Sequence, residues 1–95
     1  VKRGNMAGSS ESQGHFLLTP RHVSAARGLL QMTQAELAAA AGVDKKTIQS
    51  FEGGKHALRP TRLEAIQSAL ERRGVVFLNG DSPGVRLKSG AIIPV

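Results

Sequence analysis

Apolar residues recur at helical spacing in two short stretches in the middle of the chain, over residues 33–52. Side chains three and four positions apart lie on the same side of a helix, so each stretch has one apolar face. The apolar positions are Leu37, Ala38 and Ala41 in the first stretch, and Ile48 and Phe51 in the second. Gly42 stands between the stretches and can adopt the left-handed conformation that ends a helix in a tight turn. The pattern predicts two short helices that cross steeply.

The polar residues of the second stretch fall on the face opposite Ile48 and Phe51. They are Lys45, Lys46, Gln49 and Ser50. Ala38 is small at the point where two steeply crossing helices nearly touch. This combination predicts a helix-turn-helix, and in such a unit the outward face of the second helix enters a DNA major groove.

Capping residues mark where the helices begin. Thr19 precedes Pro20, which suits the first position of a helix because a missing N–H costs nothing there. Thr33 and Glu36 have the spacing of a capping box. The other expected caps are Asp44 for the second helix of the unit, and a second capping box of Thr61 with Glu64 for the last helix. The sequence thus predicts about four helices.

The first and last of these helices also carry an apolar face. These faces consist of Val23, Ala26, Leu29 and Leu30 up to about Gln31, and of Leu63, Ile66 and Leu70. Glycines end the later helices, with Gly53–Gly54 after the helix-turn-helix and Gly74 after the last helix. The predicted result is a compact helical bundle.

The end of the chain changes from helical to strand patterning. A short β-branched run, Val75, Val76, Phe77 and Leu78, is followed by turn residues 79–84 and then by Val85, Arg86, Leu87 and Lys88. This predicts a hairpin. An isolated hairpin is marginally stable, so it must pack on the helices or pair with another chain. We expect dimerisation through Val75, Val76, Phe77, Leu78, Val85 and Leu87, with residues 91–95 adding an apolar strand or a plug. The alternative is a hairpin that only caps the monomer core.

The domain organisation follows from these segments. Residues 1–14 are rich in Gly, Ser, Asn and Gln and are expected to form a disordered arm. Residues 1–5 read as a cloning remnant, with Met6 as the natural start. Residues 15–74 form the helix-turn-helix domain and residues 75–95 the hairpin and tail.

The run MTQAELAAAAGVDKKTIQSFEGGK resembles the Cro/repressor, or XRE-type, family of DNA-binding regulators. The resemblance covers roughly Pro20 to Leu70. It implies a mainly α, lambda-repressor-like helix-turn-helix bundle of about four helices, here followed by the C-terminal β-hairpin. The run GVVFLNGDSPGVRL is similar to the tail of a subgroup of short bacterial XRE-type regulators.

The resemblance assigns roles to particular residues. Gln34 would donate to a DNA phosphate, although a tolerated surface residue is the alternative. Lys45 and Lys46 would reach base edges and flanking phosphates, Gln49 an adenine, and Thr47 the backbone, with Ser50 on the same side. Arg27 and Glu52 would form a partly buried, structural ion pair. The loop residues expected to touch phosphates are Lys55, His56, Arg59 and Arg62, unless they only form a solvated basic loop. The resemblance also allows Arg59 or Arg62 to enter the minor groove.

Charge supports a nucleic-acid partner. The net charge is +6, and residues 43–74 hold seven Lys and Arg against four Asp and Glu. A basic surface that coincides with a helix-turn-helix favours DNA.

Other classes of protein are disfavoured. The chain has no cysteine, which fits the cytoplasm, and no apolar run approaches the ~20 residues of a membrane span. The histidines His15, His22 and His56 lack metal-ligand spacing, and no nucleophile or phosphate-binding motif is present. We therefore expect no metal, no cofactor and no enzyme activity.

The sequence predicts a homodimeric transcriptional regulator, most simply a repressor, on an inverted-repeat operator with half-sites ~34 Å apart. One alternative is an antitoxin of a toxin–antitoxin pair. Another is a protein-binding antiactivator that uses the same fold.

Overall fold

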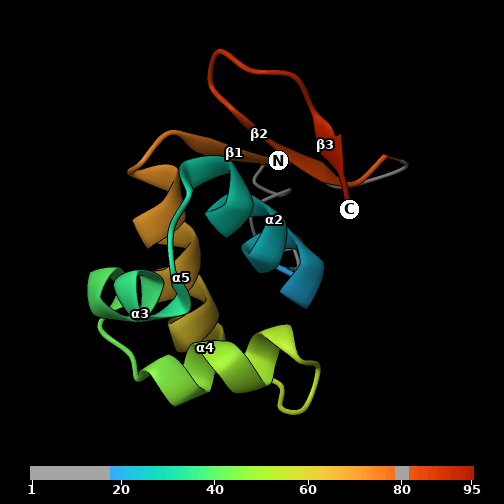
Figure 1. Ribbon diagram of the computed structural model, residues 1–95. Coiled ribbons are helices and arrows are strands. Elements are labelled where there is room, and N and C mark those ends of the chain that lie inside the picture. The colour runs from blue at the N-terminus through green and yellow to red at the C-terminus, as the bar shows by residue number, and fades with distance from the viewer. Residues whose placement is uncertain (1–17, 79–81) are drawn as a thin grey trace, which may run out of the picture.

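Helices dominate the first part of the computed structural model, which describes residues 18–78 and 82–95. Within these residues, four helices are followed by three short strands (Figure 1). The helices are α2 Pro20–Leu30, α3 Gln34–Ala41, α4 Lys45–Glu52 and α5 Pro60–Glu71. The strands are β1 Val75–Leu78, β2 Gly84–Leu87 and β3 Ile93–Pro94. The expected mainly α bundle with a C-terminal hairpin is confirmed, while the expected arm over residues 1–14 lies outside the described residues.

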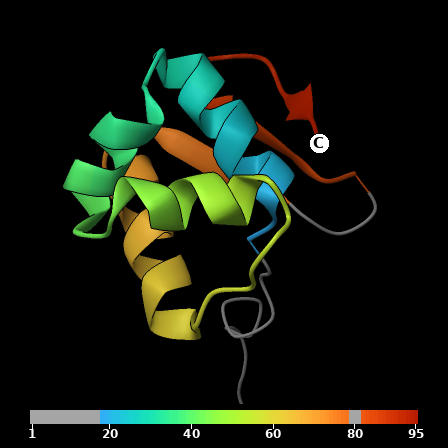
Figure 2. The same cartoon turned by 60° about the horizontal axis from the view of Figure 1, so that its bottom comes forward.

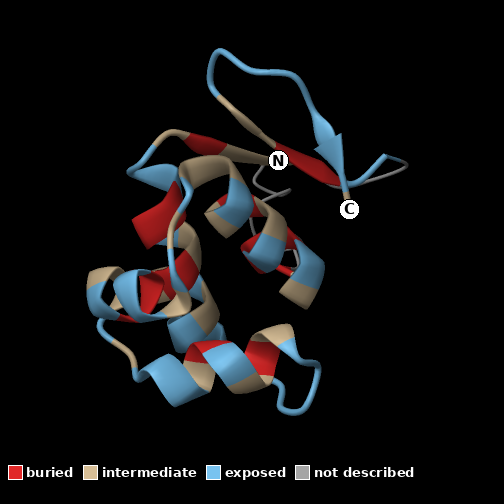
Figure 3. Cartoon of the chain, in the orientation of Figure 1, coloured by how far each residue is buried: buried red, intermediate tan, exposed pale blue. Residues whose placement is uncertain are grey.

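The core lies where the four helices and the sheet converge. Leu37 from α3, Ile48 from α4 and Ile66 and Leu70 from α5 have no exposed surface, and burying each such side chain stabilises the fold by about 2 kcal/mol. Figure 3 shows buried segments on the inward side of each helix and exposed segments on the outward side. The apolar periodicity of the sequence therefore identified the inner faces of the helices correctly.

Two capping boxes fix the starts of α2 and α3. At α3, the Glu36 N–H donates to Thr33 Oγ1 at 3.0 Å and the Thr33 N–H donates to Glu36 Oε1 at 2.8 Å, which confirms the predicted box. At α2, Thr19 accepts from the His22 N–H and His22 Nδ1 accepts from the Thr19 N–H, both at 3.2 Å. The sequence predicted Thr19 as the cap but missed His22 as its reciprocal partner.

His22 also ties α2 to the sheet. Only 2% of this residue is exposed. Because Nδ1 accepts a backbone N–H, the ring proton lies on Nε2, which donates to the Leu78 carbonyl at 3.1 Å. The ring also meets Phe77 edge-on, with 5.8 Å between ring centroids. The start of α2 is thus held from the sheet side as well as by its own cap.

The predicted caps of α4 and α5 need correction. Asp44 does occupy the N-cap position of α4, but its side chain makes no capping hydrogen bond. The second capping box, of Thr61 with Glu64, is wrong: α5 begins at Pro60 with Arg59 as N-cap and no side-chain cap. Proline at the first helical position has its φ preset for a helix, so α5 starts before Thr61 reaches a cap position.

The hairpin is present and packs on the helices. β1 and β2 pair antiparallel, with Val75 opposite Leu87 and Phe77 opposite Val85. These four side chains turn toward the helical core, in which Val75 and Val85 are buried, whereas Val76 lies on the outer face of the sheet. These four residues therefore cap the monomer core, which is the role that was expected as the alternative to dimerisation.

A third strand extends the hairpin. β3 pairs antiparallel with β2, with Ile93 opposite Val85 and Pro94 opposite Gly84, so the expected extra strand from the tail is confirmed. A Cβ on Gly84 would lie 2.7 Å from the Ile93 carbonyl oxygen, which only glycine avoids. The sheet and α4 lie on opposite sides of the pair formed by α2 and α5 (Figure 1, Figure 2).

Candidate nucleic-acid interface

α4 presents a polar face to solvent on a buried apolar base. Ile48 is fully buried and Phe51 is 5% exposed, so both fix the inner side of the helix. Lys45, Lys46 and Gln49 are exposed, as the sequence predicted for the outward face. Thr47 and Ser50, two further predicted contacts, are half-buried at the edges of this face. An exposed polar helix on a packed base can enter a groove without unfolding.

The turn between α3 and α4 sets the angle at which α4 protrudes. Gly42 ends α3 with φ of 73°, in the left-handed region that glycine adopts without strain. The Val43 N–H then donates to the Ala38 carbonyl at 3.0 Å and closes the turn. Ala38 is 4% exposed, so the small residue sits in the packed interior as predicted.

A shared carboxylate ties α4 to α2 and α3. Arg27 Nε and Nη2 donate to the two carboxylate oxygens of Glu52, each at 2.7 Å, which confirms the expected ion pair. Arg27 Nη1 also donates to the Met32 carbonyl at 2.9 Å. The hydrogen bonds that Arg27 donates to Glu52 raise the pKa of Arg27 above its ordinary value, against the opposing effect of burial. Arg27 is therefore cationic at physiological pH, and its hydrogen bonds to Glu52 hold the end of α4 against α2.

Gln34 joins the same cluster. Its Nε2 donates to Glu52 Oε1 at 3.1 Å, and the residue is half-buried. The sequence predicted a phosphate contact for this side chain and missed its contact with Glu52. Since Gln34 is the first residue of α3, its backbone N–H still points out of the helix start. The phosphate contact stays a prediction.

A basic groove runs beside α4, between this helix, the loop after it and the start of α5. It has a volume of about 700 Å³ and is open to solvent. Its charged lining residues are Lys46, Arg59, Arg62 and Asp44, and His56 and the hydroxyls of Thr47 and Ser50 add further polar groups. Part of the predicted loop and part of the predicted α4 face thus meet in this groove, whereas Lys45, Gln49 and Lys55 do not line it. A basic lining of this kind suits a phosphate backbone more than a neutral ligand.

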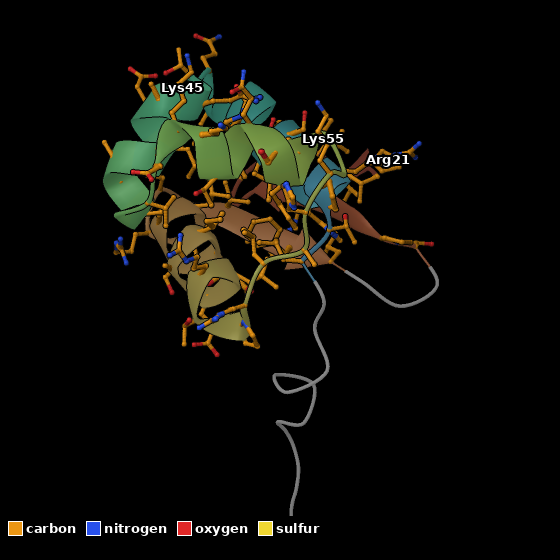
Figure 4. All side chains as sticks on the ribbon, turned by 90° about the horizontal axis from the view of Figure 1, so that it is seen from below. Arg21, Lys45 and Lys55 are labelled. Carbon is orange, nitrogen blue, oxygen red and sulfur yellow. The ribbon has the colours of Figure 1, made fainter. Side chains whose placement is uncertain are left out.

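Lys55 lies outside this groove, at the other end of α4 from Lys45. Figure 4 shows both lysines exposed along the same side of the molecule, with Arg21 of α2 just beyond Lys55. Arg21 lines a surface hollow together with Gly53 and Gly54, the two residues that precede Lys55. Sequence reasoning missed Arg21, because this residue lies more than 30 positions before the end of α4.

The expected dimerisation residues do not share this surface. Val75 is 2% exposed and Val85 is fully buried within the monomer core. Val76, Phe77, Leu78 and Leu87 are half-buried. Among residues 18–78 and 82–95, the large hydrophobic side chains that stay exposed are instead Ile92 at 54% and Ile93 at 42%, at the β3 edge of the sheet.

Two other kinds of site are not found in the described part of the chain. Residues 18–78 and 82–95 contain no group of three or more histidine or acidic side chains placed to hold a metal ion. Within the same residues, no helix has the length and apolar character needed to cross a bilayer.

The polar helix α4 protrudes from the helix-turn-helix and lies beside a basic groove. This arrangement defines a DNA-binding domain. The comparisons with known proteins agree. The family model described as helix-turn-helix matches residues 23–76, more than half of the chain, and the chain therefore belongs to the XRE-type helix-turn-helix family of DNA-binding regulators. A search of the curated proteins finds no match to the chain.

Proposed function

We propose that the protein is a sequence-specific, homodimeric transcriptional repressor that binds an inverted-repeat operator in the major groove. One observation carries this proposal: the exposed polar face of α4, with Lys45, Lys46 and Gln49, stands on the buried base of Ile48 and Phe51. A bacterial regulator of this kind acts in the cytoplasm on the nucleoid, and it represses by occluding the polymerase.

Base reading falls to the outer positions of α4. Gln49 pairs with adenine N6 and N7, while Lys46 contacts guanine O6 and N7 or a flanking phosphate. Ser50 and Thr47 donate hydroxyls at the edges of the helix. Arg59 and Arg62 lie across the basic groove from α4, which supports phosphate contacts on that side of the duplex.

Dimer geometry follows from the placement of the sheet. Stacking two sheets face to face would bury Val76 and Leu78. It would also point the two α4 helices away from each other, because the sheet and α4 lie on opposite sides of α2 and α5. A two-fold axis perpendicular to the sheet instead joins two edges and keeps all helices on one side. Both α4 helices then meet the same face of a duplex.

The β3 edge is the better candidate for such pairing. Ile92 and Ile93 are exposed there, and exposed large apolar side chains at a sheet edge favour association. Val75 and Val85 contribute indirectly, since they hold the sheet on the helical core. The dimer is what makes the site complete, because a palindromic operator needs two copies of α4 about 34 Å apart.

Fluorescence anisotropy tests the function. The chain is titrated onto DNA from upstream of its own gene and onto a scrambled duplex, across a salt series. We expect tighter binding to the native sequence, weakening steeply with salt. Gln49→Ala and Lys46→Ala should each cost about 1–3 kcal/mol on the native sequence. Lys88→Ala is the matched control, since Lys88 is exposed at the end of β2 and outside the α4 face.

Other results would count against DNA as the partner. Weak, salt-insensitive binding to both duplexes, unaffected by Lys46→Ala, would contradict the proposal. A pull-down would then separate the two alternatives: an antitoxin would capture a toxin, and an antiactivator would capture another regulator.

A further inference from the structure

Arg21 extends the basic face of α4 from a different helix. It is the second residue of α2 and is exposed. Figure 4 shows it beyond Lys55, on the same side of the molecule as Lys45 and Lys55. Three cationic side chains thus follow one another from the start of α4 to a point past its end.

The surroundings of Arg21 leave its charge available. The hollow that it lines also includes Glu52, Gly53 and Gly54 at the end of α4. Glu52 is the acidic side chain of this hollow, and both of its oxygens already bind Arg27. Within residues 18–78 and 82–95, Arg21 takes part in no salt bridge, since the ion pair found there joins Arg27 to Glu52.

The backbone beneath Arg21 is fixed relative to α4. The capping box of Thr19 with His22 brackets Arg21 in sequence, and His22 is anchored to the Leu78 carbonyl. Further along α2, Arg27 binds Glu52 at the end of α4. A side chain on such a base loses little additional backbone freedom when it binds a ligand.

We propose that Arg21 binds a backbone phosphate of the DNA strand that borders the groove occupied by α4. An α-helix of eight residues is about 12 Å long, and a major groove is about 12 Å wide. With the start of α4 over the bases, the end of the helix meets the phosphates at the groove edge. Arg21 and Lys55 lie at that end of α4. Arg59 and Arg62 lie elsewhere, in the basic groove of the protein between α4 and α5.

This inference rests on the proposed function. It predicts that Arg21 contributes to the affinity for DNA independently of the base sequence. A phosphate contact carries no base information, so Arg21→Ala should weaken binding equally on native and scrambled duplexes. Loss of one contact in each subunit should lower the slope of log affinity against log salt by about 0.9 per subunit, or about 1.8 for the dimer. At about 0.1 M salt this corresponds to an affinity loss of roughly tenfold per subunit.

The experiment compares the full chain with Arg21→Ala, Arg21→Lys and Arg72→Ala by anisotropy, on the native and scrambled duplexes, from low to high salt. Arg72 is exposed and caps the far end of α5, so Arg72→Ala makes the same change in net charge without the same placement. Circular dichroism verifies that each variant is folded. We expect a reduced salt slope for Arg21→Ala, near-complete recovery for Arg21→Lys, and a wild-type slope for Arg72→Ala.

Ethylation interference locates the contact. Blocking one phosphate at the groove edge should impair the wild-type chain and leave Arg21→Ala unaffected. Wild-type binding by Arg21→Ala, or equal losses in Arg21→Ala and Arg72→Ala, would overturn the inference; if Lys46→Ala still weakens binding, the proposed function survives. A wild-type chain with no salt-dependent binding to either duplex would overturn both.

Discussion

Replacing Glu52 with alanine removes the carboxylate that holds three helices together. In the folded chain Glu52 accepts two hydrogen bonds of 2.7 Å from Arg27 and one of 3.1 Å from Gln34. In the variant, the Arg27 guanidinium loses both hydrogen bonds to Glu52 and keeps its hydrogen bond to the Met32 carbonyl. A charge that is mostly removed from water then has no counter-ion.

The size of the effect follows from burial. The Glu52 side chain is 8% exposed and that of Arg27 is 20% exposed. Breaking a fully buried pair costs about 3–5 kcal/mol, and a hydrogen bond to a charged group contributes about 1.5–3 kcal/mol. Because water still reaches Arg27 in part, we expect a loss of about 2–4 kcal/mol. A domain of this size is stable by about 5–14 kcal/mol, so its melting temperature should fall by roughly 10–25 °C.

Urea denaturation followed by circular dichroism measures this loss. Glu71→Ala is the matched control, because Glu71 is exposed and its contact is the hydrogen bond from Gln67 one turn away; it should change stability by less than about 0.5 kcal/mol. The double variant Arg27→Met with Glu52→Leu should recover most of the stability, since no charge is left buried. A Glu52→Ala chain as stable as the Glu71→Ala control would refute the reasoning.

The remaining predictions concern glycines and the sheet. Gly42→Ala should destabilise the fold by about 1 kcal/mol, because φ is 73° while a Cβ would meet no neighbour within 4 Å; Gly28→Ala, equally free of contacts but inside α2, should stabilise it by about 0.5–1 kcal/mol. Thermal melts of the two variants should move in opposite directions, and a shift of the same sign would contradict this account of Gly42. Gly84→Ala should displace β3, since its Cβ would lie 2.7 Å from the Ile93 carbonyl oxygen; hydrogen exchange that leaves the β2–β3 pairing protected would argue against this. Ile93→Glu should convert the proposed dimer to a monomer in sedimentation while Val76→Glu leaves it intact, and the reverse result would favour face-to-face stacking of the sheets.

Local patterning explains how much the sequence could predict. Helix periodicity, the Thr33 capping box and the glycine turn at Gly42 depend on residues within a few positions of one another, and all are present. The pairing of Arg27 with Glu52 came from family resemblance, since a separation of 25 residues has no periodic signal. Local reasoning failed at Thr61, where the stronger helix-starting effect of Pro60 moved the start of α5.

Contacts between distant segments account for what was missed. His22 meets the Leu78 carbonyl 56 residues away, and Arg21 shares a hollow with Gly53. Neither contact leaves a trace in spacing or composition, because each depends on how the sheet and α4 pack around α2. The side of the bundle on which the sheet lies, which bears on the geometry of the proposed dimer, is likewise visible only in three dimensions.

The most direct test of the account is to select binding sites from a randomised duplex library with the wild-type chain and with Gln49→Arg. If α4 reads bases, the wild type should enrich an inverted repeat whose half-sites are centred about 10 base pairs apart. Gln49→Arg should then change the preferred base at one position of each half-site, from adenine toward guanine, and leave the other positions unchanged. No enrichment by the wild type, or the same consensus from both chains, would contradict the central claim that the outward face of α4 specifies the DNA sequence.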